Sequence, residues 1–246
     1  MKIKILGSGT ILSPQIRNQA GYILQNKTAF FLIDIGPGIL KQMIIAGYDV
    51  LKIDAVIISH FHSDHCADLL PFLLRRYLLD KQANRRLKIF GPQGLKVWFA
   101  GQSVFQSGWL MENLPELIEF KDENIECCGL QAQAILNGHT ENSISLFFSG
   151  EKKLFYSSDT GFNRGLVPFA KGADAAIMEC SMPDGAEVEG HLTPSKSGIL
   201  VSQAAIKKLI ITHIYPENDT ADLKSRVAEY FSGEIIIAKD FLEIEL

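Results

Sequence analysis

Three of the six histidines stand within six consecutive residues, in the segment HFHSDH from His60 to His65. His60 and His62 are two positions apart, so an extended segment would place both side chains on the same side. Asp64 and His65 follow on the expected turn into a helix. Imidazole and carboxylate together suit Zn, Mn or Fe, and no set of thiolates that could close a structural zinc site accompanies them. The segment therefore predicts a metal site rather than a chance cluster of histidines.

Other residues able to bind a metal occur where apolar segments end. Five such segments end at His60, His139, Asp159, Glu179 and His213. In a sheet, the residues just beyond neighbouring strand ends lie close in space, which is why open α/β sheets bind ligands along that edge. The sequence therefore predicts that histidines far apart in the chain converge on one site.

The elements that must position these residues are mainly strands, since short apolar runs rich in β-branched residues recur throughout the chain. Strands are expected at 3–6, 20–24, 29–34, 55–58, 87–90, 130–135, 143–148, 154–158, 175–179, 208–212, 234–238 and 241–246. Helical patterns cover 67–79, with Pro71 tolerable only in a first turn, 193–206, and 218–231, which would open at an Asn or Asp cap.

Composition indicates an ordinary globular protein, with 47% hydrophobic and 21% charged residues in a chain of 246. A chain of this length can bury a large core, and no linker rich in Gly, Ser and Pro divides it. We expect one α/β domain over residues 1–246. The four cysteines, Cys66, Cys127, Cys128 and Cys180, form no C-x-x-C pair, so free thiols are expected.

The charge balance argues against a protein that holds nucleic acid mainly through its phosphates, because 24 Lys and Arg face 28 Asp and Glu. A local basic patch that binds nucleic acid is one interpretation of a cluster of basic residues, and a solvated helix end is the other. The cluster consists of Arg75, Arg76, Lys81, Arg85, Arg86 and Lys88. Neither a leader segment nor an apolar run of membrane-spanning length is evident, so a cytoplasmic protein without membrane contact is expected.

The segment HFHSDH resembles the H-x-H-x-D-H signature of the metallo-β-lactamase superfamily. The rest of that pattern follows in order over nearly the whole chain: Asp34 in FLIDIGPG, His139 in NGHT, Asp159 in YSSDTG and His213 in ITHIYPE. The resemblance implies a four-layer αββα sandwich of two similar halves, with two divalent metal ions at one edge. Zinc is the first expectation, and manganese and iron stay open.

The resemblance also implies the ligand sets. One ion would be held by His60, His62 and His139, the other by Asp64, His65 and His213, and Asp159 would bridge them. A hydroxide between the two ions would be the nucleophile. Asp34 is left out of the ligands, because in LIDIGPG it more plausibly accepts hydrogen bonds from backbone or from a ligand histidine.

Single positions separate the branches of the superfamily. Asp159 stands where a true β-lactamase would have a different residue, and His62 stands where the diiron redox members have Glu. The segment MECSMPDGAEVEGHLTPSKSG resembles the phosphodiesterase branch around ribonuclease Z. That match implies that His191 faces the substrate phosphate and that Glu179 holds it, so Asp64, His191 and Glu179 are the residues assigned to catalysis. The alternative is that His191 merely caps the helix beginning near Thr193.

Ribonuclease Z carries a long tRNA-gripping arm between its lone His and its bridging Asp, whereas only 20 positions separate His139 from Asp159. The predicted substrate is therefore a small phosphodiester or a cyclic nucleotide, and tRNA is not an expected partner. A thioester or lactone hydrolase on the same fold is the first alternative. A ribonuclease Z-type nuclease, a non-catalytic or redox metal-binding member, and a homodimer also stay open.

Overall fold

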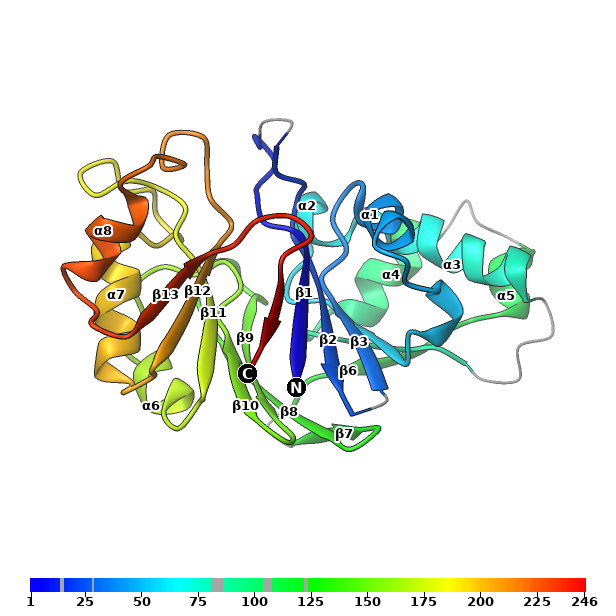
Figure 1. Ribbon diagram of the computed structural model, residues 1–246. Coiled ribbons are helices and arrows are strands. Elements are labelled where there is room, and N and C mark those ends of the chain that lie inside the picture. The colour runs from blue at the N-terminus through cyan, green and yellow to red at the C-terminus, as the bar shows by residue number, and fades with distance from the viewer. Residues whose placement is uncertain (14–15, 28, 81–85, 104–107, 122–123) are drawn as a thin grey trace.

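The computed structural model describes residues 1–13, 16–27, 29–80, 86–103, 108–121 and 124–246. In this part of the chain, two seven-stranded sheets pack against each other (Figure 1). The first has the order β14-β1-β2-β3-β4-β5-β6 and the second β13-β12-β11-β10-β9-β8-β7. The first sheet contains β1 (Lys2–Gly7), β2 (Gly21–Asn26), β3 (Ala29–Ile33), β4 (Ala55–Ile57), β5 (Lys88–Gly91), β6 (Glu116–Glu119) and β14 (Glu243–Glu245). The second contains β7 (Ile125–Cys127), β8 (Leu130–Leu136), β9 (Ile144–Ser149), β10 (Lys153–Tyr156), β11 (Ala175–Glu179), β12 (Lys208–Thr212) and β13 (Glu234–Ile237).

Both sheets are mixed. Strands β3 to β6 run parallel in the first sheet, and β10 to β13 run parallel in the second. Parallel neighbours end at the same edge: Ile33 of β3 pairs with Ile57 of β4, and Glu179 of β11 pairs with Thr212 of β12. The residues that follow these strands are therefore held next to one another, as the sequence pattern predicted.

Helices cover the outer face of each sheet (Figure 1). The first sheet carries α1 (Ile39–Ile45), the 3₁₀ turn η1 (Val50–Lys52), α2 (Ser63–Cys66), α3 (Leu69–Leu79), α4 (Leu95–Ser103) and α5 (Trp109–Glu112). The second carries α6 (Leu166–Ala170), α7 (Pro194–Gln203) and α8 (Leu223–Ala228). The result is the four-layer αββα sandwich that the resemblance implied.

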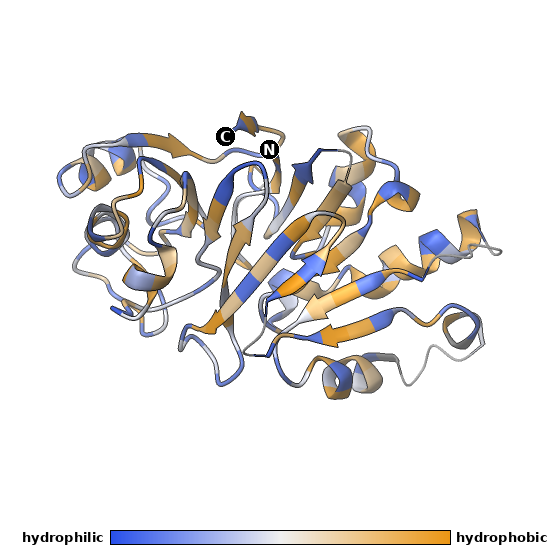
Figure 2. Cartoon of the chain, turned by 90° about the horizontal axis from the view of Figure 1, so that it is seen from below, coloured by the Kyte–Doolittle hydropathy of each residue, from blue (hydrophilic) through white to orange (hydrophobic). Residues whose placement is uncertain are grey.

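Three apolar clusters hold the layers together. One lies between the sheets and includes Tyr22 and Tyr156, one lies between the first sheet and its helices around Phe72, and the third includes Phe155 on the opposite side. Seen from below, much of the apolar colour lies on the strands (Figure 2). Strand β8 shows why: its alternating sequence LQAQAIL buries Leu130 and Ala132 toward the other sheet and leaves the glutamines exposed.

All twelve strands expected from the sequence are present, but β6 and β7 were not predicted. Each is the last strand of its sheet. Strand β6 has the partly exposed sequence ELIE, and β7 has only three residues. An edge strand that is half solvated lacks the apolar run on which the sequence argument depends. The short helices α1, α4, α5 and α6 were likewise not predicted, and Asp64 and His65, expected on a turn, lie in the short helix α2.

The three expected helices exist, with one correction. Pro71 lies in the first turn of α3, and Pro194 is the first residue of α7. The third helix, α8, begins only at Leu223, and the side chain of its N-cap Asp222 does not cap it. That carboxylate instead accepts a hydrogen bond from Thr220 Oγ1 at 2.6 Å, which keeps the segment before the helix in a turn.

The basic segment near the end of α3 is only partly described, since Lys81 and Arg85 lie outside the described residues. Arg76 uses its guanidinium to donate hydrogen bonds to the carbonyls of Val50 and Ile53, so it supports η1 and is not a free cation of a patch. All four cysteines are thiols rather than members of disulfides, as expected. Within the described ranges, no helix is long and apolar enough to cross a membrane.

Candidate metal centre

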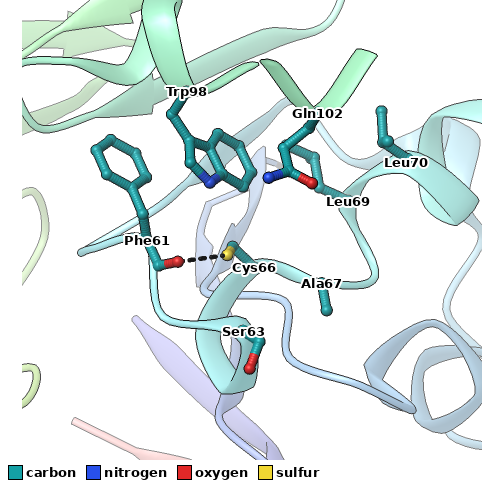
Figure 3. Close-up of a pocket in the computed structure, with 8 residues that line it drawn as sticks. All are labelled: Phe61, Ser63, Cys66, Ala67, Leu69, Leu70, Trp98 and Gln102. Atoms are coloured by element: carbon teal, nitrogen blue, oxygen red, sulfur yellow. Dashed lines mark hydrogen bonds between the residues drawn. The ribbon is translucent and has the colours of Figure 1, made fainter. Parts of the chain in front are cut away.

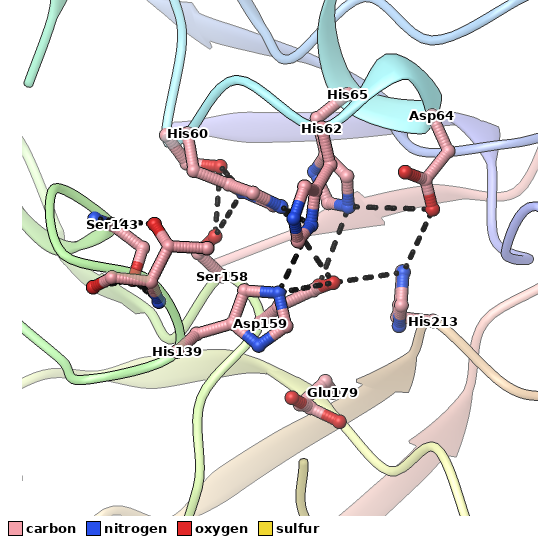
Figure 4. A network of polar contacts seen from close by, with 12 residues as sticks. His60, His62, Asp64, His65, His139, Ser143, Ser158, Asp159, Glu179 and His213 are labelled. Atoms are coloured by element: carbon pink, nitrogen blue, oxygen red, sulfur yellow. Dashed lines mark hydrogen bonds and ion pairs between the residues drawn. The ribbon is translucent and has the colours of Figure 1, made fainter. Parts of the chain in front are cut away.

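The predicted ligand residues gather at one edge of the two sheets (Figure 4). They come from both sheets: His60 follows β4, His62 is the N-cap of α2, Asp64 and His65 lie in α2, His139 follows β8, Asp159 follows β10 and His213 follows β12. Among the described residues, five groups have ligand atoms within 4.8 Å of one another: His60, His62 and His139; His60, His65 and Asp159; Asp64, His65 and His213; His139, Asp159 and His191; and Glu179, His191 and His213. The structure thus brings together all seven residues.

The backbone turns sharply where the strands reach this edge. Asp34, Ser158 and His213 each stand just beyond a strand and have left-handed φ angles of 53°, 53° and 51°. Residues other than glycine adopt this region rarely and at a cost, and such residues concentrate at functional sites. The turns let polar side chains leave the strand direction and face the gap between the sheets.

The first cluster is a contact of three imidazole nitrogens. His60 Nε2 lies 3.1 Å from His62 Nδ1, and the same His62 nitrogen lies 3.1 Å from His139 Nε2. Two nitrogens bound to one tetrahedral zinc ion, at the usual bond length near 2.0–2.1 Å, would lie roughly 3.3 Å apart. The spacing of the three nitrogens is therefore close to that of donors sharing an ion.

The second cluster is looser, and Asp159 joins it to the first. His213 Nε2 lies 3.6 Å from Asp64 Oδ2 and 3.2 Å from Asp159 Oδ2, and His65 Nε2 lies 3.3 Å from Asp159 Oδ1. Asp159 Oδ2 also lies 3.9 Å from His60 Nε2 and 3.8 Å from the corresponding nitrogen of the loop histidine His139. One carboxylate thus reaches both clusters.

Several of these atoms lack a hydrogen-bond partner although they are buried. His65 Nε2, His213 Nε2 and Asp159 Oδ1 are all in this state. A buried polar atom without a partner is costly and rare, and a missing ion is one of its ordinary explanations. The donor set and its orphaned atoms therefore fit divalent cations.

The electrostatics of His60 and Asp159 point the same way. Those of His65 differ, because burial lowers its pKa but Asp159 and Asp34 raise it well above its usual range. Burial, followed by the neighbouring His65, lowers the pKa of His60 well below its usual range, which leaves the neutral imidazole that binds a metal. Burial alone would raise the pKa of Asp159, but His213 and His65 hold it well below its usual range. The carboxylate is therefore ionised and available to a cation.

Asp34 lies behind the clusters, fully buried, and accepts hydrogen bonds from three side chains and one amide. His65 Nδ1, Ser59 N and Ser59 Oγ each lie 2.8 Å from its oxygens, and Tyr156 Oη lies at 2.6 Å. When the ring is neutral, the bond from His65 Nδ1–H to Asp34 leaves Nε2 without a proton and turned toward the site. Asp34 thus has the contacts expected of a residue that fixes a ligand histidine.

Glu179 lies behind the other half of the site. Its carboxylate accepts from Thr160 N at 2.6 Å, Leu192 N at 3.1 Å, His191 Nδ1 at 3.1 Å and the hydroxyl of Ser181. Burial lowers the pKa of His191, but the hydrogen bond and charge of Glu179 raise it to about 9. The expected pair of His191 and Glu179 is therefore present.

The helix-cap alternative for His191 does not match the contacts. Thr193, not His191, is the N-cap of α7. The amide of Ser195 in the first turn is capped instead by the carboxylate of Asp184, at 3.2 and 3.3 Å. His191 instead lies beside the histidine clusters, and its ring centre lies 4.8 Å from that of His139.

The sequence argument missed several polar residues of the site. Ser59 and Ser181 hydrogen-bond both to a buried carboxylate and to a histidine, and Ser158 donates to Ser59 Oγ at 2.7 Å. The ring centre of Tyr215 lies 6.0 Å from that of His191 and 5.9 Å from that of His213. Each stands within two positions of a predicted site residue at a strand end, and that adjacency was the available signal.

A small cavity of about 120 Å³ lies beside the HFHSDH segment and is lined by Phe61, Ser63, Cys66, Ala67, Leu69, Leu70, Trp98 and Gln102 (Figure 3). Phe61 stacks on Trp98 with ring centres 5.1 Å apart. The Cys66 thiol donates to the carbonyls of Phe61 and His62 at 3.4 and 3.0 Å, and burial raises its pKa to about 12. This thiol supports the backbone of the ligand segment and is not poised as a thiolate ligand.

The fold and the site define the class. Two mixed sheets between helices, with His and Asp clusters at one edge, are those of a metallo-hydrolase with the metallo-β-lactamase fold. The family model described as Anti-Pycsar protein Apyc1 matches residues 1–229, and the chain belongs to this family.

Relatives agree with this class. The probable metallo-hydrolase YhfI of Bacillus subtilis is 25% identical over 247 aligned positions, covering 97% of each chain. A ribonuclease Z of Exiguobacterium sp. is 38% identical over 300 positions, covering 99% of this chain and 98% of the relative. The crystal structure of YhfI superposes with a TM-score of 0.87 at 23% identity, over 99% of this chain and 98% of YhfI.

Proposed function

We propose that the protein is a dinuclear metal-dependent phosphodiesterase that hydrolyses a cyclic nucleotide or a similarly small phosphodiester. The observation that carries this proposal is the position of Asp159 between two imidazole clusters, next to a histidine paired with a carboxylate. Family membership supports it, because the chain belongs to the family described as Anti-Pycsar protein Apyc1, and its relatives include a ribonuclease Z.

In this proposal His60, His62 and His139 hold one ion, Asp64, His65 and His213 hold the other, and Asp159 bridges them. Zinc suits the set best, because its ligands are imidazole and carboxylate in groups of three or four. Bound ions would supply a water of lowered pKa and neutralise charge on the phosphate. Asp64, which lies 3.6 Å from His213 Nε2, acts in catalysis as a ligand of the second ion.

His191 is the imidazole that the two clusters do not need. Glu179 accepts its Nδ1–H, so Nε2 is the atom left to face a substrate. In the metal-free protein burial lowers the pKa of this ring, but Glu179 raises it to about 9, which favours a proton on both nitrogens at neutral pH. Nε2–H donates a hydrogen bond to a nonbridging phosphate oxygen and then transfers its proton to the leaving alkoxide. The other proton stays on Nδ1, hydrogen-bonded to Glu179. Solvent returns the proton after the product leaves.

The fully described segment between His139 and Asp159 contains no arm with which to hold tRNA. Between His139 and Asp159 it forms only the hairpin of β9 and β10, joined by a short turn at 150–152. The 300 positions aligned with ribonuclease Z exceed the 246 residues of this chain by 54, so the relative has segments that the chain lacks. The net charge of −4 also disfavours a polyanionic substrate.

The test is a substrate panel on metal-loaded protein. The expected result is hydrolysis of a 3′,5′-cyclic nucleotide and of an activated aryl phosphodiester, without cleavage of precursor tRNA. Preference for a thioester or lactone would replace the proposal by the first alternative from the sequence. Efficient cleavage of precursor tRNA would show that the missing arm is not required. No turnover of any substrate by fully loaded protein would favour a binding protein.

A further inference from the structure

We propose that Ser181 is a positioning residue, which couples the Glu179 carboxylate to the metal ligand His213. This rests on the ligand assignment of the proposed function. Ser181 is fully buried at the end of β11, and His213 follows the neighbouring strand β12. Its Oγ contacts Glu179 Oε2 and lies 3.1 Å from His213 Nδ1. A single hydroxyl thus connects two groups that do not otherwise share a hydrogen bond.

Counting protons gives the direction of each bond. A serine hydroxyl has one hydrogen to donate and two lone pairs with which to accept. An ionised carboxylate can only accept, so the Ser181 hydroxyl donates to Glu179. Its single hydrogen is then not available to the backbone carbonyl of His213, which lies 3.1 Å from the same Oγ, and His191 Nδ1 lies 3.3 Å from it. The bond to His213 must then run from Nδ1–H of the ring to Ser181 Oγ. That tautomer leaves His213 Nε2 without a hydrogen, and it is Nε2 that lies buried and unpartnered beside Asp159 at 3.2 Å.

The other half of the site contains the same arrangement. Ser59 Oγ lies 2.8 Å from Asp34 Oδ2 and 3.1 Å from His60 Nδ1. The same proton count makes Ser59 donate to the carboxylate and accept from the His60 ring, leaving His60 Nε2 to face the first cluster. The same sequence of contacts, from carboxylate to serine to histidine, thus occurs once at each sheet. This repetition argues that the serine helps to orient each ligand histidine.

The two serines differ in the second histidine that is bound by their carboxylate partner. Asp34 bonds directly to another cluster histidine, whereas Glu179 bonds directly to His191. Ser181 therefore joins the orientation of His213 to the residue that faces the substrate. Without its hydroxyl, His213 Nδ1–H would lose its acceptor and the ring could take the other tautomer. Loss of such an outer partner costs about 10- to 100-fold in metal affinity.

The experiment measures zinc binding by chelator competition, on full-length wild type, Ser181→Ala and a matched control. Ser197→Ala is the control, because Ser197 is equally buried and its hydroxyl donates to the Glu179 backbone carbonyl at 2.9 Å without touching a histidine. The expected result is a loss of about 10- to 100-fold in affinity for one zinc equivalent in Ser181→Ala only. Melting temperatures of the two metal-free variants should fall by similar amounts.

Unchanged zinc affinity in Ser181→Ala, or an equal loss in Ser197→Ala, would overturn the role of Ser181. A second measurement needs no variant of this serine: ¹⁵N NMR of metal-free wild type should show His213 with its proton on Nδ1. A proton on Nε2 would contradict the proposal even if Ser181→Ala does not fold. Wild type that binds fewer than two equivalents would refute the dinuclear assignment itself, which separates the two failures.

Discussion

Asp34 and Glu179 occupy comparable places in the two halves of the molecule, but they serve different groups. Asp34 follows β3 in the first sheet and Glu179 ends β11 in the second, each beside a parallel neighbour. Asp34 bonds directly to His65 and, through Ser59, to His60. Both of its imidazoles belong to the clusters that we assign to metal.

Glu179 divides its contacts between the clusters and the substrate side. Through Ser181 it reaches His213, a cluster residue, and directly it holds His191. The side chain of His191 is 11% exposed, whereas those of His65 and Asp34 are almost fully covered. Asp34 therefore orients only imidazoles of the clusters, while Glu179 also holds an imidazole that is partly accessible from the site.

The largest effect should come from removing what the two halves share. In Asp159→Ala both clusters lose their common carboxylate, so zinc content should fall from about two equivalents per chain and turnover should be undetectable. Elemental analysis and a phosphodiester assay on the same sample check this. The control is wild type stripped with chelator and reloaded, which should regain both metal and activity. A reloaded Asp159→Ala with full activity would show that the clusters work independently.

A smaller loss of activity should follow when only His191, the imidazole outside the proposed ligand sets, is removed. His191→Ala should reduce turnover of phosphodiesters by about 10² to 10⁴, the usual contribution of a positioned proton donor, because the transition state loses that donor. Zinc content should stay at the wild-type level. His65→Ala is the matched contrast, since it should lose metal and activity together. Normal turnover with intact metal in His191→Ala would remove this residue from the mechanism.

The sequence sufficed to predict that the proposed ligands lie together, because their signal is local or lies at strand ends. HFHSDH places four donors on one turn, and His139, Asp159 and His213 each end an apolar run, so sheet geometry alone brings them together. The serines could not be predicted in the same way. Serine is common beside strand ends, and only the register of β11 against β12 shows that Ser181 reaches His213.

The edge strands of the sheets and the first residue of α8 could not be predicted from the sequence for a different reason. Strand β6 reads ELIE and depends on pairing with β5 rather than on its own apolar pattern. Helix α8 starts late because Asp222 bonds to Thr220 and pairs with Arg226 at 3.4 Å instead of capping. Such competition between local hydrogen bonds is decided by geometry that residue types alone do not reveal.

The two carboxylates should fail differently when each is made neutral. Asp34→Asn and Glu179→Gln each replace an acceptor of several buried donors, so both should lose about 1–3 kcal/mol of stability. Asp34→Asn should also bind zinc less tightly, and excess zinc should restore its turnover. Glu179→Gln should stay slow in excess zinc, because His191 is then less well held and less often protonated. Rates measured against zinc concentration separate them, and equal rescue would erase the distinction.

The smallest effect concerns the charge on His191 in the metal-free protein. Burial lowers its pKa, but Glu179 raises it to about 9, above the ordinary value of 6.5. Because the folded-state pKa is raised, the charged ring contributes stability that is complete below about pH 6.5 and is lost as the pH rises through about 9. Chemical unfolding of metal-free wild type at a series of pH values should show this loss, and His191→Ala should show less of it.

In Glu179→Gln the burial of His191 stays while the carboxylate charge is gone, so its pKa should fall below the wild-type value. Histidine NMR titration of metal-free protein measures this directly, with His191→Ala identifying the resonance. Metal-free protein is the right sample, because bound cations would add positive charge close to the ring and lower its pKa. A wild-type pKa below 6.5 would mean that Glu179 does not charge His191. The second half would then differ from the first only in exposure, and the proton donor for the leaving group would have to be sought elsewhere.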